Sequence, residues 1–151
     1  MRSMTLLNHK INKMIQSVSF EKHLIAPCGM NCGTCIAYLR DKNNCPGCRI
    51  ISSDKAISVK KCIVTECRYL QKTTSKFCYD CEKYPCQRIK NLDKRYRTKY
   101  RTCFIENLSM IKEKGLDSFL AFETNRRTCI NCGSVFSVHR DHCIKCNQTL
   151  K

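Results

Sequence analysis

Residues 28–48 read CGMNCGTCIAYLRDKNNCPGC, a stretch of 21 residues that contains five cysteines. The first three cysteines are spaced C-x3-C-x2-C, a spacing that radical enzymes use to hold an iron–sulfur cluster. The last two form C-x2-C within CPGC, which is typical of a zinc knuckle. The stretch therefore allows three interpretations: disulfide bonding, zinc binding, or binding of an iron–sulfur cluster.

The composition of the whole chain favours metal over disulfide bonds. The chain has 151 residues, of which 15 are cysteine and none is tryptophan. A chain this short forms one domain or two small ones, and with a modest apolar supply it needs crosslinks or metals to stay folded. We see no signal-peptide segment near the N-terminus and no run of transmembrane length. We therefore expect a cytoplasmic protein, away from membranes, with reduced thiols as metal ligands.

The C-terminal cysteines give the strongest signal. They form two C-x2-C pairs that are ten residues apart: Cys129, Cys132, Cys143 and Cys146. Each pair is followed by a residue that tolerates positive φ, Gly133 or Asn147. With SVFSV between the pairs as a short β ribbon, four thiolates predict a closed, structural zinc ribbon. His139 and His142 would then lie beside the metal site or be exposed, without binding the ion.

Ten further cysteines lie between residues 28 and 86: Cys28, Cys32, Cys35, Cys45, Cys48, Cys62, Cys67, Cys78, Cys81 and Cys86. One grouping joins the cysteines at 32, 35, 45 and 48, and another joins those at 62, 67, 78 and 81. Cys28 and Cys86 then remain, one at each end. We expect about three zinc ions in the whole chain. The alternative is one [4Fe–4S] cluster in this ten-cysteine block.

Cys103 stands apart from these groups. We expect a buried thiol that packs with Phe104, and the alternative is a reactive thiol beside Arg101. The sequence has no phosphate-binding glycine loop, no H-E-x-x-H and no nucleophile elbow, so it predicts no conventional catalysis.

The segment between residues 88 and 101, RIKNLDKRYRTKYR, carries seven positive charges and one aspartate. Its candidate contacts to nucleic acid are Arg88, Lys94, Arg95, Tyr96, Arg97, Lys99, Tyr100 and Arg101, through phosphates and base stacking. The alternative is a solvated helix whose tyrosines seat it on the core. The formal net charge is +16, and three zinc ions with four thiolates each would leave about +10. Either value favours a polyanionic partner.

Together these patterns predict a small metal-stabilised α+β fold. Short helices and zinc knuckles in a treble-clef-like arrangement precede a helical segment and the C-terminal zinc ribbon. The expected divisions are an N-terminal amphipathic helix or extension (1–26), a cysteine-rich metal-binding domain with the basic helix (27–101), a helical connector (102–127) and the ribbon (128–151). Within the connector, Phe104, Leu108 and Ile111 would share one apolar face of a first helix. Gly115 would end that helix and Asp117 would cap the next.

Several pieces between residues 24 and 101 resemble a known family: LIAPCGMNCGTC, CPGCR, CIVTEC, FCYDCEKYPCQRIK and DKRYRTKY. They look like the uncharacterised cysteine-rich family called domain of unknown function 3795, with the following helix and the ribbon as a common extension. The resemblance implies a zinc-binding prokaryotic protein with no established activity.

The function that these observations favour is a zinc-stabilised binding module that contacts nucleic acid or a nucleic-acid-associated protein. One alternative is an iron–sulfur redox or metallocluster accessory protein whose basic face docks an acidic protein partner. A second alternative is a metal or thiol sensor in which Cys28, Cys86 or Cys103 is a labile ligand.

Overall fold

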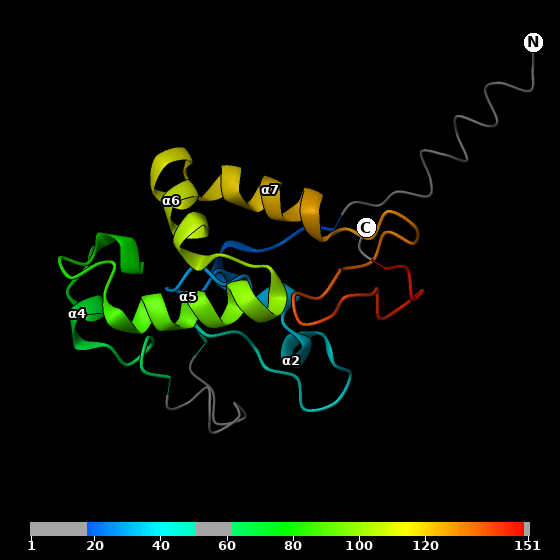
Figure 1. Ribbon diagram of the computed structural model, residues 1–151, viewed down its shortest axis with the longest axis horizontal. Helices are drawn as coiled ribbons and strands as arrows, with labels where there is room; N and C mark the ends of the chain where they lie inside the picture. Colours follow the sequence, from blue (N-terminus) through cyan, green and yellow to red (C-terminus); the bar gives the residue numbers. More distant parts are fainter. Residues whose placement is uncertain (1–17, 51–61, 150–151) are drawn as a thin grey trace, which may run out of the picture.

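The structure is a computed structural model that describes residues 18–50 and 62–149, and these residues form a small, mostly helical fold (Figure 1). Three longer helices follow one another in the segment predicted to be helical: α5 (Gln87–Tyr100), α6 (Phe104–Lys114) and α7 (Leu116–Arg127). The short elements are η1 (Lys22–Leu24), η2 (Cys32–Thr34), α2 (Ile36–Leu39), α4 (Arg68–Gln71) and η3 (Cys78–Asp80). The N-terminal amphipathic helix falls largely outside the described residues.

The β structure in the described ranges is limited to three isolated antiparallel bridges. They join Ile25 to Asn31, Thr128 to Val135 and His142 to Thr149. The predicted ribbon at SVFSV contributes one of these bridges and does not extend further. The physical reason is that the Ser137 hydroxyl and the Val138 N–H both donate to the carbonyl of Thr34, at 3.0 and 2.9 Å. The helical part of the fold prediction is therefore confirmed, whereas its β part is small.

Buried Asp93 holds α5 and α6 together at their junction. Its carboxylate accepts the N–H of Ile105 at 3.1 Å, which satisfies one of the free donors in the first turn of α6. It also pairs with Arg97, one turn further along α5. Between the helices, Arg101 takes a left-handed conformation with φ of 52°, which lets the chain reverse.

Gly115 joins α6 directly to α7. Its φ of +86° favours glycine, although a Cβ here would meet no atom within 4 Å. The helix that we expected Asp117 to cap begins one residue earlier, at Leu116, and Asp117 makes no cap. Asp117 instead forms an ion pair with Lys22 of η1. Its carboxylate points out of the first turn of α7 and lies 3.0 Å from the Lys22 ammonium.

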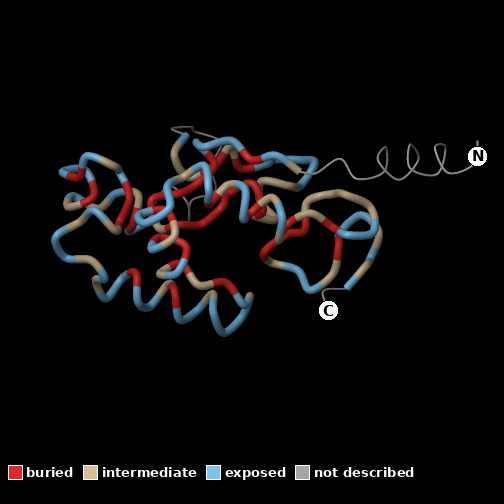
Figure 2. The backbone as a smooth tube through the Cα atoms, turned by 90° about the horizontal axis from the view of Figure 1, so that it is seen from above, coloured by how far each residue is buried: buried red, intermediate tan, exposed pale blue. Residues whose placement is uncertain are grey.

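The core of the helical part consists of two adjoining apolar clusters, and a third, smaller one lies in the C-terminal unit; the buried residues run through the middle of the molecule (Figure 2). The larger cluster includes Ile25, Ile89, Leu108 and Phe119. The second is formed by Leu24, Ala26, Met30, Cys32, Phe104 and Val138. The apolar face predicted for α6 is confirmed, since Phe104, Leu108 and Ile111 are all buried. The described helices are too short or too polar to span a membrane.

A buried polar network fixes the loop of residues 28–32 against α6 and α7. Asn107 of α6 donates to the carbonyl of Gly29 at 2.9 Å and accepts from Arg126 of α7 at 3.1 Å. Arg126 pairs with Glu123, whose other carboxylate oxygen accepts from the Asn31 amide at 3.0 Å. Buried polar groups are stable only when they are bonded in this way, so the network sets the position of the first cysteines.

Candidate metal centre

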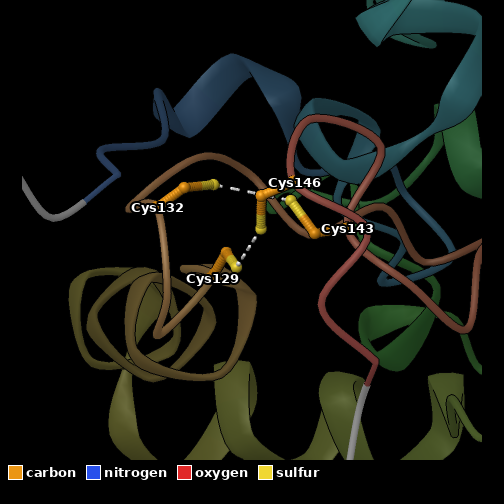
Figure 3. A group of neighbouring side chains, drawn as sticks. All are labelled: Cys129, Cys132, Cys143 and Cys146. Atoms are coloured by element: carbon orange, nitrogen blue, oxygen red, sulfur yellow. Dashed lines mark hydrogen bonds between the residues drawn. The ribbon is translucent and has the colours of Figure 1, made fainter.

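The four C-terminal cysteines converge on one point from two loops, with their sulfurs directed toward one another (Figure 3). All four Sγ atoms lie within 4.8 Å of one another. The Sγ atoms of Cys129 and Cys146 are 3.6 Å apart, as are those of Cys132 and Cys143. The predicted grouping of these cysteines is therefore present as a close cluster.

The two halves of the cluster have the same backbone geometry. In the first, the N–H of Gly133 donates to Cys129 O at 2.8 Å, and in the second the N–H of Asn147 donates to Cys143 O at 2.9 Å. Gly133 and Asn147 have φ of 74° and 61°, so both take the left-handed conformation that the sequence predicts. Two matched turns thus present the pairs of thiols to each other.

The sulfur spacing fits a tetrahedral metal ion. With metal–sulfur bonds of about 2.3 Å, the sulfurs of a tetrahedral zinc site lie about 3.8 Å apart. The two 3.6 Å separations are close to that value and far from the length of about 2.05 Å of a disulfide bond. None of the fifteen cysteines, all of which lie in the described residues, is disulfide-bonded. Four soft ligands with this spacing could hold zinc or iron.

The thiols of this cluster differ in acidity. A hydrogen bond with the Ser134 hydroxyl lowers the pKa of Cys132 to about 6, and one with the Asn131 side chain lowers the pKa of Cys146. Burial raises the pKa of Cys129 to about 11. A bound cation would supply the opposite charge that stabilises all four as thiolates.

The histidines near the cluster have other partners. The Nδ1 of half-buried His139 accepts the N–H of Ile36 at 3.3 Å, so the neutral ring carries its proton on Nε2 and donates it to the Tyr96 hydroxyl at 3.1 Å. Burial, with Arg140 and Arg127 nearby, lowers the pKa of His139 and favours this neutral form. His142 pairs with Asp141 at 2.7 Å. His139 thus joins the C-terminal unit to α2 and α5.

The ten-cysteine block lies along the two core clusters. Cys32 belongs to the second cluster, and Cys28, Cys35 and Cys48 pack against it. The N–H of Cys48 donates to the Sγ of Cys32 at 3.4 Å, which is the kind of bond that supports a thiolate. Burial raises the pKa of Cys35, and the nearby Cys45 and Cys48 act in the same direction. These neighbours are the members of the first grouping.

The remaining cysteines of the block gather around buried Cys78. Burial raises its pKa to about 12, with further contributions from Cys28, Cys86, Cys67 and Cys81. Cys62 and Cys28 pack against the same core cluster. Cys28 therefore contacts both clusters, and neither it nor Cys86 is remote from the others. Within residues 18–50 and 62–149, however, the C-terminal cysteines are the one group of metal-ligand atoms that lie this close together.

Arg49 lies among the thiols of the block, a feature that sequence reasoning missed. Its Nε donates to Ile25 O at 2.6 Å, and its guanidinium lies 4.5 Å from the centre of the Phe77 ring. Burial lowers its pKa, whereas nearby Cys28, Cys32, Cys78 and Cys48 act to raise it. The CPGCR sequence was the available signal, because it places a cation directly after a cysteine pair.

Cys103 is half-buried at the start of α6, next to Asp93 and Arg97. Burial and the adjacent Asp93 carboxylate raise its pKa, which keeps it a protonated thiol. The raised pKa disfavours the reactive thiol, and Cys103 is half-buried instead of fully buried as expected.

The basic helix is divided between an outer face and an inner face. Arg88, Lys94, Arg95, Arg97, Lys99 and Arg101 are exposed. Tyr96 and Tyr100 are half-buried, with ring centres 5.0 Å apart, and Tyr100 lies 4.8 Å from the His139 ring. Tyr96 also lies 4.6 Å from Phe104. The tyrosines therefore seat α5 on the core. Among the exposed cations, Arg97 pairs with Asp93 and Arg88 donates to Ile63 O at 3.2 Å.

These features define a small, cysteine-rich and mostly helical protein with a four-cysteine group that could hold a metal ion. Residues 24–91 match the model of a family described as protein of unknown function (DUF3795). The predicted resemblance is thus confirmed, although the match ends at residue 91 and not at residue 101. The four-cysteine group lies outside the matched residues. No curated protein and no solved structure matches the chain.

Proposed function

We propose that this protein is a zinc-stabilised module that binds nucleic acid. The observation that carries the metal part is the four-cysteine group, whose sulfurs lie within 4.8 Å of one another on two matched turns. A closed set of four thiolates leaves no position for water or substrate, so its role is to stabilise the fold. The residues around it form a zinc ribbon in this proposal.

The ten-cysteine block holds the other ions, in a treble-clef-like arrangement. The cysteines at 32, 35, 45 and 48 bind one zinc, supported by the Cys48 N–H bond to Cys32. Those gathered around Cys78 bind the second. The chain then holds about three zinc ions, as tetrathiolate sites require. Arg49 offsets part of the negative charge of these sites.

The basic surface supports nucleic acid as the partner. The chain has 28 lysines and arginines against 12 acidic residues. Of the cations on α5, Lys94 and Arg95 are exposed, whereas Arg97 is paired with Asp93. Free cations on a rigid helix bind phosphates and carry no sequence preference of their own.

The test is binding of a labelled single-stranded oligonucleotide by fluorescence anisotropy, with zinc-loaded protein. We expect affinity to fall about 50-fold between 50 and 200 mM salt if four phosphates are contacted. Neutralising Lys94 and Arg95 to glutamine weakens binding, whereas neutralising Lys112 and Lys114 on α6 removes the same charge and has a smaller effect. Absence of binding at low salt, or equal losses in both variants, would contradict the proposal.

A further inference from the structure

A cleft of about 840 Å³ opens between the ends of α5 and α7 and the C-terminal unit. Five basic side chains line it: Lys99, Arg101, Arg126, Arg127 and Arg140. They come from three separate parts of the chain, and only the fold brings them together in one cleft. One carboxylate, Asp141, also lines the cleft, and it pairs with His142 at 2.7 Å.

Arg127 is the unusual member of this set, because it is only 8% exposed. Its guanidinium donates to the Thr102 hydroxyl at 3.0 Å, while its Nε is buried without a hydrogen-bond partner. It forms no ion pair with any described residue. The nearest acidic influence, Glu123, is already bonded to Arg126 and Asn31.

A buried guanidinium without a counterion is costly, because it loses its hydration and gains no opposite charge. Burial accordingly lowers the pKa of Arg127. Its place in the last turn of α7 offers some compensation through the helix dipole, but only part of what an anion would supply. The described residues around Arg127 therefore supply no negative charge that pairs with its guanidinium.

We propose that this cleft binds a phosphate group, with Arg127 at its base and Lys99, Arg101 and Arg140 at its rim. Arginine forms paired hydrogen bonds with phosphate oxygens, and the three rim residues are exposed and come from two segments, the end of α5 and the C-terminal unit. Arg126 is not among the proposed phosphate ligands, since its hydrogen bonds go to Glu123 and Asn107. The inference rests on the proposed function for one point, that the phosphate belongs to a nucleic acid.

Inorganic pyrophosphate is the first probe, because it carries the required chemistry and no base or sugar. We expect it to shift the backbone amide resonances around residues 99–101, 126–128 and 138–142 of the zinc-loaded protein. Neutralising the exposed pair Arg101 and Arg140 to glutamine weakens binding about tenfold or more. The matched variant with Lys112 and Lys114 neutralised binds as the unchanged protein does. Shifts spread over all basic surfaces, or equal effects of both variants, overturn the proposal.

A second test compares how pyrophosphate changes the melting temperatures of the unchanged protein and of Arg127→Met. A purely structural role of Arg127 would not predict different responses. The Thr102 hydroxyl keeps its bond to Tyr100 O at 3.2 Å, so the substitution leaves no donor there unpaired. Without an anion, we expect the variant to melt at or above the temperature of the unchanged protein. Added pyrophosphate raises the melting temperature of the unchanged protein and leaves that of the variant unmoved. An equal rise in both contradicts the assignment.

A single-stranded oligonucleotide distinguishes the two sources of phosphate. If the variant with Arg101 and Arg140 neutralised binds both pyrophosphate and the oligonucleotide more weakly, the cleft holds a phosphate of a nucleic acid. If pyrophosphate binds in the cleft and the oligonucleotide does not bind, the phosphate site stands and the nucleic-acid function fails. If the oligonucleotide binds with equal affinity to the variant and pyrophosphate does not bind, the cleft proposal fails while the proposed function stands.

Discussion

Asp93 shows what one buried charge does in this protein. It is 1% exposed, yet it joins three groups from two helices and the turn between them: the Ile105 N–H, Arg97 and Cys103. Burial acts to raise its pKa, but the hydrogen bonds from these groups outweigh burial, and the pKa is lowered. The charged form is therefore the one that the folded state requires.

Replacing Asp93 with asparagine removes this charge, while the amide oxygen of the new side chain can still accept the Ile105 N–H. We expect a loss of about 1–2 kcal/mol in the free energy of unfolding at pH 7, measured with urea. Because the folded pKa lies below the unfolded one, the contribution is present above the unfolded pKa and is lost as pH falls through the folded pKa. The difference between the two proteins should therefore shrink below about pH 4. A difference that stays constant with pH would show that the charge is not its source.

Gly29 and Gly115 form a matched pair for alanine substitution. Both have positive φ, +88° and +86°, where the backbone of an alanine is strained by about 1–3 kcal/mol. At Gly29 a Cβ would also lie 3.1 Å from Leu108 and 3.2 Å from the Phe104 carbonyl, whereas at Gly115 it meets nothing. We expect Gly29→Ala to destabilise the protein markedly more than Gly115→Ala in thermal unfolding. Equal effects would mean that the loop of residues 28–32 does not pack against α6.

At the scale of the elements, α6 and α7 position the first cysteines through the network of Asn107, Arg126, Glu123 and Asn31. The loop that carries Cys28 and Cys32 is closed locally by backbone hydrogen bonds, such as those between Ala26 and Met30 and between Gly29 and Ala26. Its placement on α6 and α7 also depends on side chains that lie more than 70 residues away in the sequence.

Asn107→Ala should cost about 1–3 kcal/mol, because it leaves the Gly29 carbonyl buried without a partner. Ser109→Ala is the control, since Ser109 is exposed on the same helix. Calorimetric melting checks the difference. If the two variants melt at the same temperature, the network does not hold the loop.

Sequence reasoning predicted the local features well. The apolar spacing of Phe104, Leu108 and Ile111 predicted the buried face of α6, and the positions of Gly133 and Asn147 predicted the two left-handed turns. Both depend on neighbouring residues and fixed backbone preferences. Asp117 was wrongly expected to cap α7, because its pairing with Lys22 depends on tertiary packing.

The features that the sequence did not predict are those that join distant segments. His139 was expected either beside the metal or exposed, without binding the ion, and its bonds to Ile36 and Tyr96 come from the docking of the C-terminal unit on α2 and α5. The basic run contributes Lys99 and Arg101 to the phosphate cleft, whereas Arg127 and Arg140 reach it only through the fold. Contacts between distant segments leave no periodic pattern in the sequence, so they could not be predicted from it.

At the scale of the whole molecule, metal is central to our account of stability. The core cluster of the C-terminal unit consists of Cys129, Phe136 and Cys143, so two of its three buried residues are proposed ligands. An apolar core of this size does not hold a fold without a further constraint. In our proposal zinc binding would supply that constraint, since its free energy is available only when the four sulfurs are brought together.

Chelation of the metal should therefore unfold the C-terminal unit before the helices. We expect a strong chelator to remove the hydrogen-exchange protection of residues 129–147 while α6 keeps part of its own. Re-addition of zinc restores the protection, and magnesium, which prefers oxygen ligands, does not. Unchanged protection after chelation would mean that this unit folds without metal.

The most direct test of the central claim is the metal content of the chain, purified under anaerobic conditions without added metal, and of two variants. We predict about three zinc ions per chain, one fewer in Cys143→Ser, and the full number in Cys103→Ser, since Cys103 lies outside the four-cysteine group. Iron with acid-labile sulfide would assign the ten-cysteine block to a cluster and replace zinc there. A folded protein that contains no metal, or equal metal content in Cys143→Ser and the unchanged chain, would contradict the account.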